Sequence, residues 1–245
     1  MVGSTQSTAG PNFVLNTMVA DVLAEIADEL ENASNVKTKA QQILQKIATD
    51  HKKIVFNGDN YSEDWIQQAQ KRGLPNIAST VESLKTALEK ENVELFKRHS
   101  VLSEVELYAR IEILLEAYSM SINIEAEAML NMAKRRFLPA AVASAKRLAD
   151  TITSMKTAGS EPKTLTKKLG KVSRLIEAVD TAVDSLEKAL EKAVAMKDIP
   201  KQADLYSTTI VPKLVALREP VDELEKIVDA DLWPVPTYAQ MLFLR

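Results

Sequence analysis

The sequence predicts an all-α protein, and three observations support this fold class. Residues that favour helices, mainly Ala, Leu, Glu and Lys, dominate the composition, whereas the 245 residues include only six glycines. Apolar residues recur at steps of three and four over long segments, which is the period of a helix with one buried face. Three long helical segments in the second half are separated by short turns. We therefore expect a long-helix bundle with a projecting antiparallel helical hairpin.

The longest predicted helix covers residues 104–157 and contains Pro139 as its only helix breaker. A proline removes one backbone donor and clashes with the preceding turn, so we expect a kink or a break at Pro139. A continuous helix would be roughly 80 Å long at about 1.5 Å per residue, so it must bend or project. Its apolar stripe, which must be buried, comprises Ile111, Leu114, Leu115, Tyr118, Ile122, Ala126, Met129, Leu130, Ala133, Phe137, Ala141, Ala145, Leu148, Ile152 and Met155.

The first fifty residues predict two shorter amphipathic helices. The segment Met1–Pro11 is small and polar, and taken alone it predicts a disordered tail. Asn12 would then cap the first helix, and a second helix is expected near Val36–His51. The residues expected to face inward are Leu15, Val19, Val22, Leu23, Ile26, Ala27 and Leu30 in the first helix and Ala40, Ile43, Leu44 and Ile47 in the second.

The sequence changes character after the second helix. Ile54–Phe56 is a short β-type run, and Asn57–Asn60 follows it as a turn. Ser62 is expected to begin a helix that carries Trp65 and ends at Gly73. Further short helices are expected at residues 81–88 and 93–97.

Two more helices are predicted after a turn at Gly159, over residues 165–195 and 199–228. The second of them is expected to be interrupted at Pro212 and Pro220. The first resembles a coiled-coil seam, with the apolar residues Leu169, Val172, Ile176, Val179, Val183, Leu186, Leu190 and Val194 in register. Pairing of these two helices would form the antiparallel hairpin.

Composition and charge argue against several functions. The net charge of −3 does not suit a nucleic-acid-binding protein, because phosphate neutralisation requires a surplus of Lys and Arg. The absence of cysteine excludes disulfides, thiolate metal sites and cysteine nucleophiles. No apolar run approaches the roughly 18 residues of a membrane span, and the first residues do not resemble a signal peptide. We therefore expect a cytoplasmic protein with no nucleic-acid partner and no membrane partner.

The titratable residues do not form a recognisable catalytic or metal-binding motif. His51 and His99, the two histidines, lie in different segments, and we expect surface or capping roles for them. A di-metal bundle needs Glu-x-x-His pairs on two helices, and the long helix offers no such pair. The glutamates considered for this role are Glu112, Glu116, Glu125 and Glu127, of which Glu125 lies near the apolar stripe and is expected to be ion-paired or to reach solvent.

Basic and turn residues give two further candidates. Lys134–Arg136 predicts a solvated face or an interface pair, with a phosphate site as the alternative. Gly58 and Gly73 do not match a phosphate-binding loop. Trp65 and Trp233 are expected to anchor loops onto the bundle, with ligand stacking as the alternative. We therefore predict no catalytic, cofactor-binding or metal-binding residue in this chain.

Four stretches carry a resemblance to one family. Met1–Leu23, Ile54–Ile77 (IVFNGDNYSEDWIQQAQKRGLPNI) and Asp231–Phe243 (DLWPVPTYAQMLF) resemble consecutive landmarks of the C-terminal part of type III glutamine synthetase. Glu112–Ala140, with the core INIEAEAMLNMAKRRFLPA, is similar to the same family. These landmarks combine Asn, Gly, Trp and Pro in specific orders and extend almost from the first residue to the last.

The resemblance implies a division of the chain and a function. Residues 1–33 would be the end of the catalytic domain and the first helix, and residues 34–245 a helical C-terminal domain. The chain would be the C-terminal portion of an ATP-dependent glutamate–ammonia ligase, starting at an internal methionine. ATP, magnesium and their ligands would belong to the upstream part, so this portion would be non-catalytic. Its role would be structural, oligomer-forming or regulatory within a large homo-oligomer.

A second reading is a stand-alone helical protein-interaction module. Its hairpin, residues 165–228, would bind a partner helix. An exposed apolar patch of roughly several hundred Å² would favour such a partner.

Overall fold

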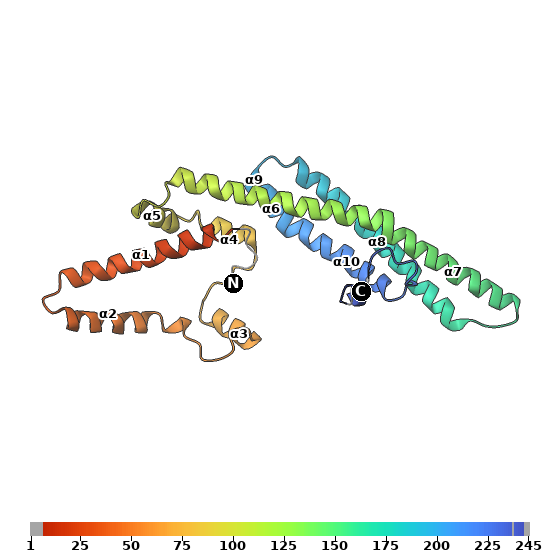
Figure 1. The fold of residues 1–245 in the computed structure, drawn as a ribbon, viewed down its shortest axis with the longest axis horizontal. Helices are drawn as coiled ribbons and strands as arrows, with labels where there is room; N and C mark the ends of the chain where they lie inside the picture. The colour runs from red at the N-terminus through yellow and green to blue at the C-terminus, as the bar shows by residue number, and fades with distance from the viewer. Residues whose placement is uncertain (1–6, 237, 243–245) are drawn as a thin grey trace. The chain divides into compact units, whose positions relative to one another are not determined.

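The computed structural model describes residues 7–236 and 238–242, and the regular structure of these residues is entirely helical (Figure 1). The predicted all-α class is confirmed. The chain divides into two compact units, Met1–Ile111 and Glu112–Arg245, and the boundary falls within helix α6, Glu104–Met132. The domain boundary that the family resemblance implies at residue 33 stays a prediction.

The first unit is built from short helices around a small core. Figure 1 shows α1 and α2 as an antiparallel pair joined by a short turn. The ring of Phe13 on α1 meets Phe96 on α5 edge-on, with 5.7 Å between ring centroids. The elements are α1 (Ala9–Glu31), α2 (Val36–Asp50), the 3₁₀ turn η1 (Lys52–Ile54), α3 (Glu63–Lys71), α4 (Thr80–Thr86) and α5 (Lys90–Arg98).

Helix α1 begins four residues earlier than predicted, with Thr8 in the N-cap position in place of Asn12. The N–H of Asn12 donates to the carbonyl oxygen of Thr8, so Asn12 lies inside the helix and does not cap it. Pro11 is tolerated because the first turn of a helix needs no backbone donor from its residues. Residues 9–11 are therefore helical and do not belong to the tail expected from their composition, and residues 1–6 lie outside the described part.

The apolar stripes predicted for α1 and α2 are buried only in part. Besides pairing with α2, helix α1 contacts its unit through Phe13, Thr17 and Asp21, which lie on the side opposite the stripe. Leu15 and most other stripe residues of α1 are exposed as a result. On α2 only Ile43 is buried, while Leu44 and Ile47 are exposed.

The prediction of a β-type run at residues 54–56 is wrong. Residues 52–54 form the 3₁₀ turn η1, and Val55, which follows it, has an extended backbone conformation. The aromatic ring of Phe56 packs on Trp65, with 4.7 Å between centroids, and Arg72 lies 5.5 Å over the Trp65 ring. Arg72 Nη1 also donates to the carbonyl oxygens of residues 53 and 55, at 3.1 and 2.7 Å. Gly58 lies close to Phe56, since an added Cβ would lie 2.7 Å from the end of that ring. Trp65 thus anchors this loop onto its own helix, α3.

The predicted cap of α3 and its end are confirmed. The Ser62 hydroxyl accepts from the Trp65 N–H at 3.4 Å, and Glu63 and Asp64 occupy the first turn, where the helix dipole favours them. Gly73 follows the helix with φ of +69°, a conformation that favours glycine.

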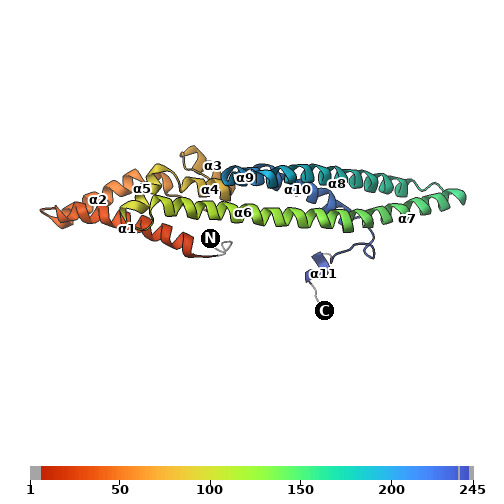
Figure 2. The same cartoon turned by 90° about the horizontal axis from the view of Figure 1, so that it is seen from above.

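The second unit contains the larger core, to which α6, α7, α8 and α10 contribute. Figure 2 shows α8 running alongside α7, and α8 packs against both α7 and α10. The elements after α6 are the π-helical segment η2 (Ala133–Phe137), α7 (Leu138–Thr157), α8 (Lys163–Ala195), α9 (Ile199–Leu205), the π-helical segment η3 (Tyr206–Ile210), α10 (Val211–Glu225) and α11 (Tyr238–Leu242). The fully buried side chains of this unit include Val172, Val179, Val183, Leu186, Ile210, Leu217 and Leu224. That a hairpin projects from the bundle stays a prediction.

The stripe predicted for residues 104–157 is buried or half-buried at every position except Leu114, which is exposed. On α8 the exception is Val194, which is exposed, while the neighbouring Ala193 is fully buried. A step of one residue turns a helix by about 100°, so the end of a stripe is easily misplaced.

The predicted breaks at the prolines do not occur. The N–H of Leu138 donates to the carbonyl of Ala133, five residues back, so the chain forms a π-helical turn just before Pro139. Val211, just before Pro212, donates to Tyr206 in the same way. A π turn widens the helix and lets it continue past a residue that lacks an N–H. Pro220 lies inside α10 without a break.

Replacing Leu186 by Ala is expected to lower the free energy of unfolding by about 2–5 kcal/mol, because its fully buried side chain would leave a cavity. The matched variant Val194→Ala, on the exposed side of the same helix, should change it by less than about 0.5 kcal/mol. Urea denaturation followed by circular dichroism measures both. Equal effects would contradict the assignment of the core face of α8.

Candidate functional site

Both histidines stand at the C-terminal ends of helices. The N–H of His51 donates to the Ile47 carbonyl at 3.0 Å, and His99 closes α5. The Nε2 atom of His99 lies 2.7 Å from Asp21 Oδ1 on α1, and Arg98 forms an ion pair with the same carboxylate at 3.1 Å. The carboxylate beside His99 is therefore Asp21, which is far from it in sequence. This cluster fastens α5 to α1.

The four glutamates of α6 that were considered as metal ligands, Glu112, Glu116, Glu125 and Glu127, are exposed and form no metal-binding group. Glu127 accepts a hydrogen bond from Asn123 Nδ2 at 3.0 Å, and Asn123 Oδ1 accepts from the Tyr206 hydroxyl at 2.8 Å. Burial raises the pKa of Tyr206, and the charge of Glu127 adds to this shift. These three residues connect η3 to α6.

The basic segment Lys134–Arg136 is exposed, and Lys134 forms an ion pair with Glu187 on α8. Of the roles predicted for this segment, an ion pair between helices therefore applies to Lys134. In the described part of the chain, no three His, Cys, Asp or Glu side chains are grouped to hold a metal ion. Over residues 7–236 and 238–242, no helix has both the length and the apolar character to cross a membrane.

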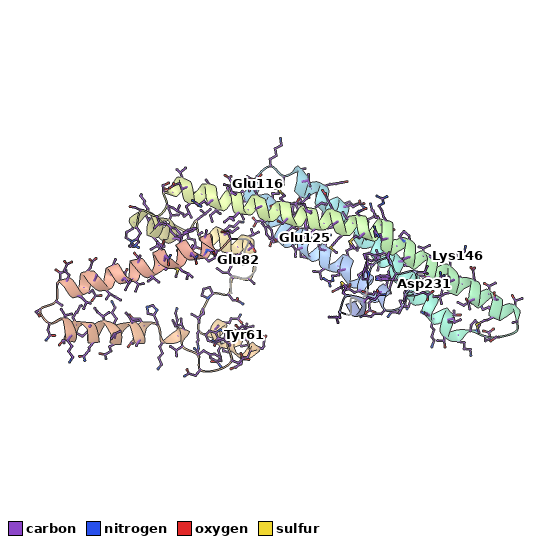
Figure 3. All side chains as sticks on the ribbon, viewed as in Figure 1. Tyr61, Glu82, Glu116, Glu125, Lys146 and Asp231 are labelled. Atoms are coloured by element: carbon purple, nitrogen blue, oxygen red, sulfur yellow. The ribbon has the colours of Figure 1, made fainter. Side chains whose placement is uncertain are left out.

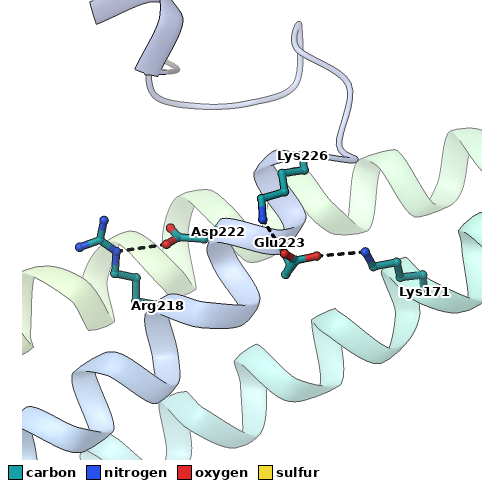
Figure 4. Close-up of polar contacts among 5 residues, drawn as sticks. All are labelled: Lys171, Arg218, Asp222, Glu223 and Lys226. Atoms are coloured by element: carbon teal, nitrogen blue, oxygen red, sulfur yellow. Dashed lines mark hydrogen bonds and ion pairs between the residues drawn. The ribbon is translucent and has the colours of Figure 1, made fainter. Parts of the chain in front are cut away.

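A network of charged residues joins α8 to α10 (Figure 4). Glu223 accepts from Lys171 on α8 at 3.0 Å and from Lys226 at 2.6 Å, and Arg218 pairs with Asp222 at 3.2 Å. Hydrogen bonds from Lys226 and Lys171, with their positive charges, lower the pKa of Glu223 from 4.5 to about 2. The carboxylate is exposed, so solvent screens these ion pairs and limits what each contributes.

The segment after α10 is held against α7. Arg147 pairs with Asp231 at 2.8 Å and with Asp229 at 3.3 Å, and Figure 3 shows Asp231 beside α7. Trp233 is buried and stacks on Phe137, with 5.0 Å between ring centroids. The prediction that Trp233 anchors this loop onto the bundle is confirmed.

The second unit contains an apolar hollow of about 360 Å³ beside η2. Its walls include Met129, Met132, Phe137, Val221, Trp233 and Met241, and Arg218, Asp222 and Glu225 also line it. The Nε1 atom of Trp233 is buried and finds no hydrogen-bond partner among the described residues. A hollow lined by methionine and aromatic side chains suits an apolar group, because methionine adapts to irregular shapes.

Sequence reasoning did not find this hollow. Its walls come from α6, η2, α10 and the segment after α10, which are far apart in sequence. The sequence did show that Phe137 and Trp233 are large aromatic residues close to prolines. Which of them meet depends on tertiary packing.

The fold and its surfaces define a class of protein. The residues described above form an all-α protein in which charged side chains such as Lys134 and Glu223 pair across neighbouring helices. Large apolar side chains are exposed along α1 and α6. These features are typical of a protein that packs against other protein surfaces.

Comparison with known proteins identifies the family. A family model described as the glutamine synthetase C-terminal domain matches residues 39–156. A type-3 glutamine synthetase of Dictyostelium discoideum is 34% identical, and the match covers 100% of this chain and 34% of that protein. A glutamine synthetase of Butyrivibrio fibrisolvens is 32% identical, over 93% of this chain and 32% of the relative. A glutamine synthetase of Bacteroides fragilis is 29% identical, over 99% of this chain and 35% of the relative.

The chain therefore belongs to the glutamine synthetase family and corresponds to the C-terminal region of its type III members. The resemblance inferred from the sequence landmarks is confirmed. The chain spans about a third of the length of these relatives.

Glu223→Gln is expected to reduce the acid sensitivity of the fold. Because the folded pKa is depressed, Glu223 contributes stability that is fully present above pH 4.5 and is lost as the pH falls through about 2. The melting temperature of the unsubstituted protein should therefore fall more steeply across this window than that of Glu223→Gln. Glu219→Gln, at an exposed position of the same helix, is the control. The same slope for all three proteins would contradict the role of Glu223.

Trp233→Ala is expected to lower the free energy of unfolding by about 3–5 kcal/mol, because it removes a buried ring that stacks on Phe137. Tyr61→Ala, which truncates an exposed ring, should change it by less than about 0.5 kcal/mol. Guanidinium denaturation followed by circular dichroism measures both. A loss below about 1 kcal/mol for Trp233→Ala would contradict the anchoring role.

Proposed function

We propose that this chain is the helical, non-catalytic C-terminal portion of a type III glutamine synthetase. It packs against the remainder of the enzyme and contributes to contacts within a homo-oligomer. ATP-dependent ligation of ammonia to glutamate, with ATP and magnesium, belongs to the remainder. The expected compartment is the cytoplasm, with no nucleic-acid partner and no membrane partner.

The exposed apolar face of α1 carries this proposal. Leu15, Val19 and Leu23 are 57%, 58% and 60% exposed in the chain by itself. Val14, Met18 and Val22 are also exposed, so six large apolar side chains of one helix lack a covering surface within the described chain. Exposed apolar patches of this extent mark protein contacts.

The relatives suggest what covers this face. They are about three times as long as this chain, so most of each lies outside the matched region. That remaining part of the enzyme offers the surface that would cover the α1 face. Leu44 and Ile47 of α2, the helix paired with α1, are exposed as well.

The hairpin of the stand-alone interaction module is less well suited to a partner. Within residues 165–228, the large apolar side chains that are exposed are Val194 and Val215. A partner helix needs a continuous apolar stripe, which two separate valines do not supply. The α1 face is the larger surface.

The test replaces the corresponding third of the Butyrivibrio fibrisolvens enzyme by this chain. In that chimera, the triple variant Leu15→Ser, Val19→Ser, Leu23→Ser is expected to lower glutamine formation and assembly at least about tenfold. In the isolated chain the same variant should leave stability within roughly 0.5 kcal/mol per substitution, because the three side chains are exposed.

The matched control, Val142→Ser with Val215→Ser, replaces exposed apolar residues elsewhere. The isolated chain should form no glutamine from glutamate, ammonia and ATP. Glutamine formation by the isolated chain, or a triple variant as active as the control, would refute the proposal.

A further inference from the structure

Helix α6 is apolar on two opposite sides. Leu115, Ala126 and Leu130 lie on its buried side. Ile113, Met120 and Ile124 lie on the other side, and they are 63%, 60% and 60% exposed. At about 100° per residue, Leu115 and Ile113 point about 160° apart. A helix with apolar residues on both sides is normally covered on both.

The apolar residues on the exposed side of α6 follow a regular helical spacing. Ile113, Ala117, Met120, Ile124 and Ala128 follow one another at steps of four, three, four and four residues, and all five are exposed. We refer to these residues as the outer stripe. All of them lie in the second unit.

The outer stripe is complementary to itself when reversed. If two copies run antiparallel with a two-fold axis beside Met120, Ile113 faces Ala128 of the other copy and Ala117 faces Ile124. Each isoleucine then meets an alanine, which allows two helices to approach to about 8–10 Å. Met120 meets Met120 at the axis. A two-fold contact requires this kind of self-complementary surface.

The edges of the outer stripe are acidic. Residues 104–132 contain six glutamates and one arginine. Glu116 and Glu125, which Figure 3 labels on α6, are nine residues apart and therefore lie about half a turn from each other. Two copies would bring these charges near one another, so salt should strengthen the contact by screening their repulsion.

We propose that the outer stripe of α6 pairs with the outer stripe of a second copy, antiparallel about a two-fold axis at Met120. This inference rests on the proposed function and names the surface through which the chain would contribute to the homo-oligomer. The stripe spans roughly 22 Å at about 1.5 Å per residue, so the pair is a small interface that acts with other contacts of the assembly.

Single cysteines test both the contact and its register, because the chain has no cysteine of its own. Met120→Cys places a thiol at the axis in each copy, within the reach of about 7 Å between Cα atoms that a disulfide needs. Ile113→Cys faces Ala128→Cys of the other copy and does not face itself. Val142→Cys, at an exposed position of α7, measures random collision. All four positions are exposed, so the fold should tolerate each substitution.

The purified chains are oxidised under identical conditions, and the rate of disulfide-linked dimer formation is measured. Met120→Cys should form dimers at least about tenfold faster than Val142→Cys, and faster still at high salt. Ile113→Cys alone should match the control, whereas its mixture with Ala128→Cys should cross-link rapidly.

Equal rates for Met120→Cys and Val142→Cys overturn the proposal, and so does rapid cross-linking of Ile113→Cys alone. These outcomes leave the proposed function intact, since that is judged by the α1 face and by the chimera. Conversely, an α6 contact can be found even if the isolated chain proves catalytic.

Discussion

The second unit depends on the packing of α8 against α7 and α10. The buried residues of α8, such as Val179 and Leu186, each contribute roughly 1.5–3 kcal/mol relative to exposure. The ion pairs around this core are exposed, and exposed pairs contribute about 0–1 kcal/mol. The core therefore decides which helices are neighbours. Pairs such as Lys171–Glu223 follow from that arrangement and make it sensitive to acid.

Two prolines show how this core tolerates helix breakers. Each is preceded by a π-helical turn, at Ala133–Phe137 and Tyr206–Ile210, and the helix continues beyond it. The first turn also carries Phe137, which stacks on Trp233, and the second carries the buried Tyr206. The widened turns thus both accommodate a missing donor and supply two of the aromatic residues that connect distant segments.

The proposed function of the chain rests on its exposed surfaces. The polar groups that could have suggested chemistry serve other roles: His99 pairs with Asp21, and Lys134 with Glu187. What lacks a covering surface in the described chain is apolar, along α1 and along the outer stripe of α6. In a chain that spans about a third of its relatives, we propose that these faces contact the rest of the enzyme and a second copy.

The sequence by itself determined the all-α class, the buried stripe of residues 104–157, the cap at Ser62 and the family. Each is a local periodicity, a cap signal or a run of specific residues. Only the tertiary structure determined that the helix continues past Pro139, because the π turn before it depends on packing along the whole helix. It also decided which face of α1 is buried and which walls surround the apolar hollow. These outcomes depend on contacts between residues far apart in sequence, which a helical period cannot specify.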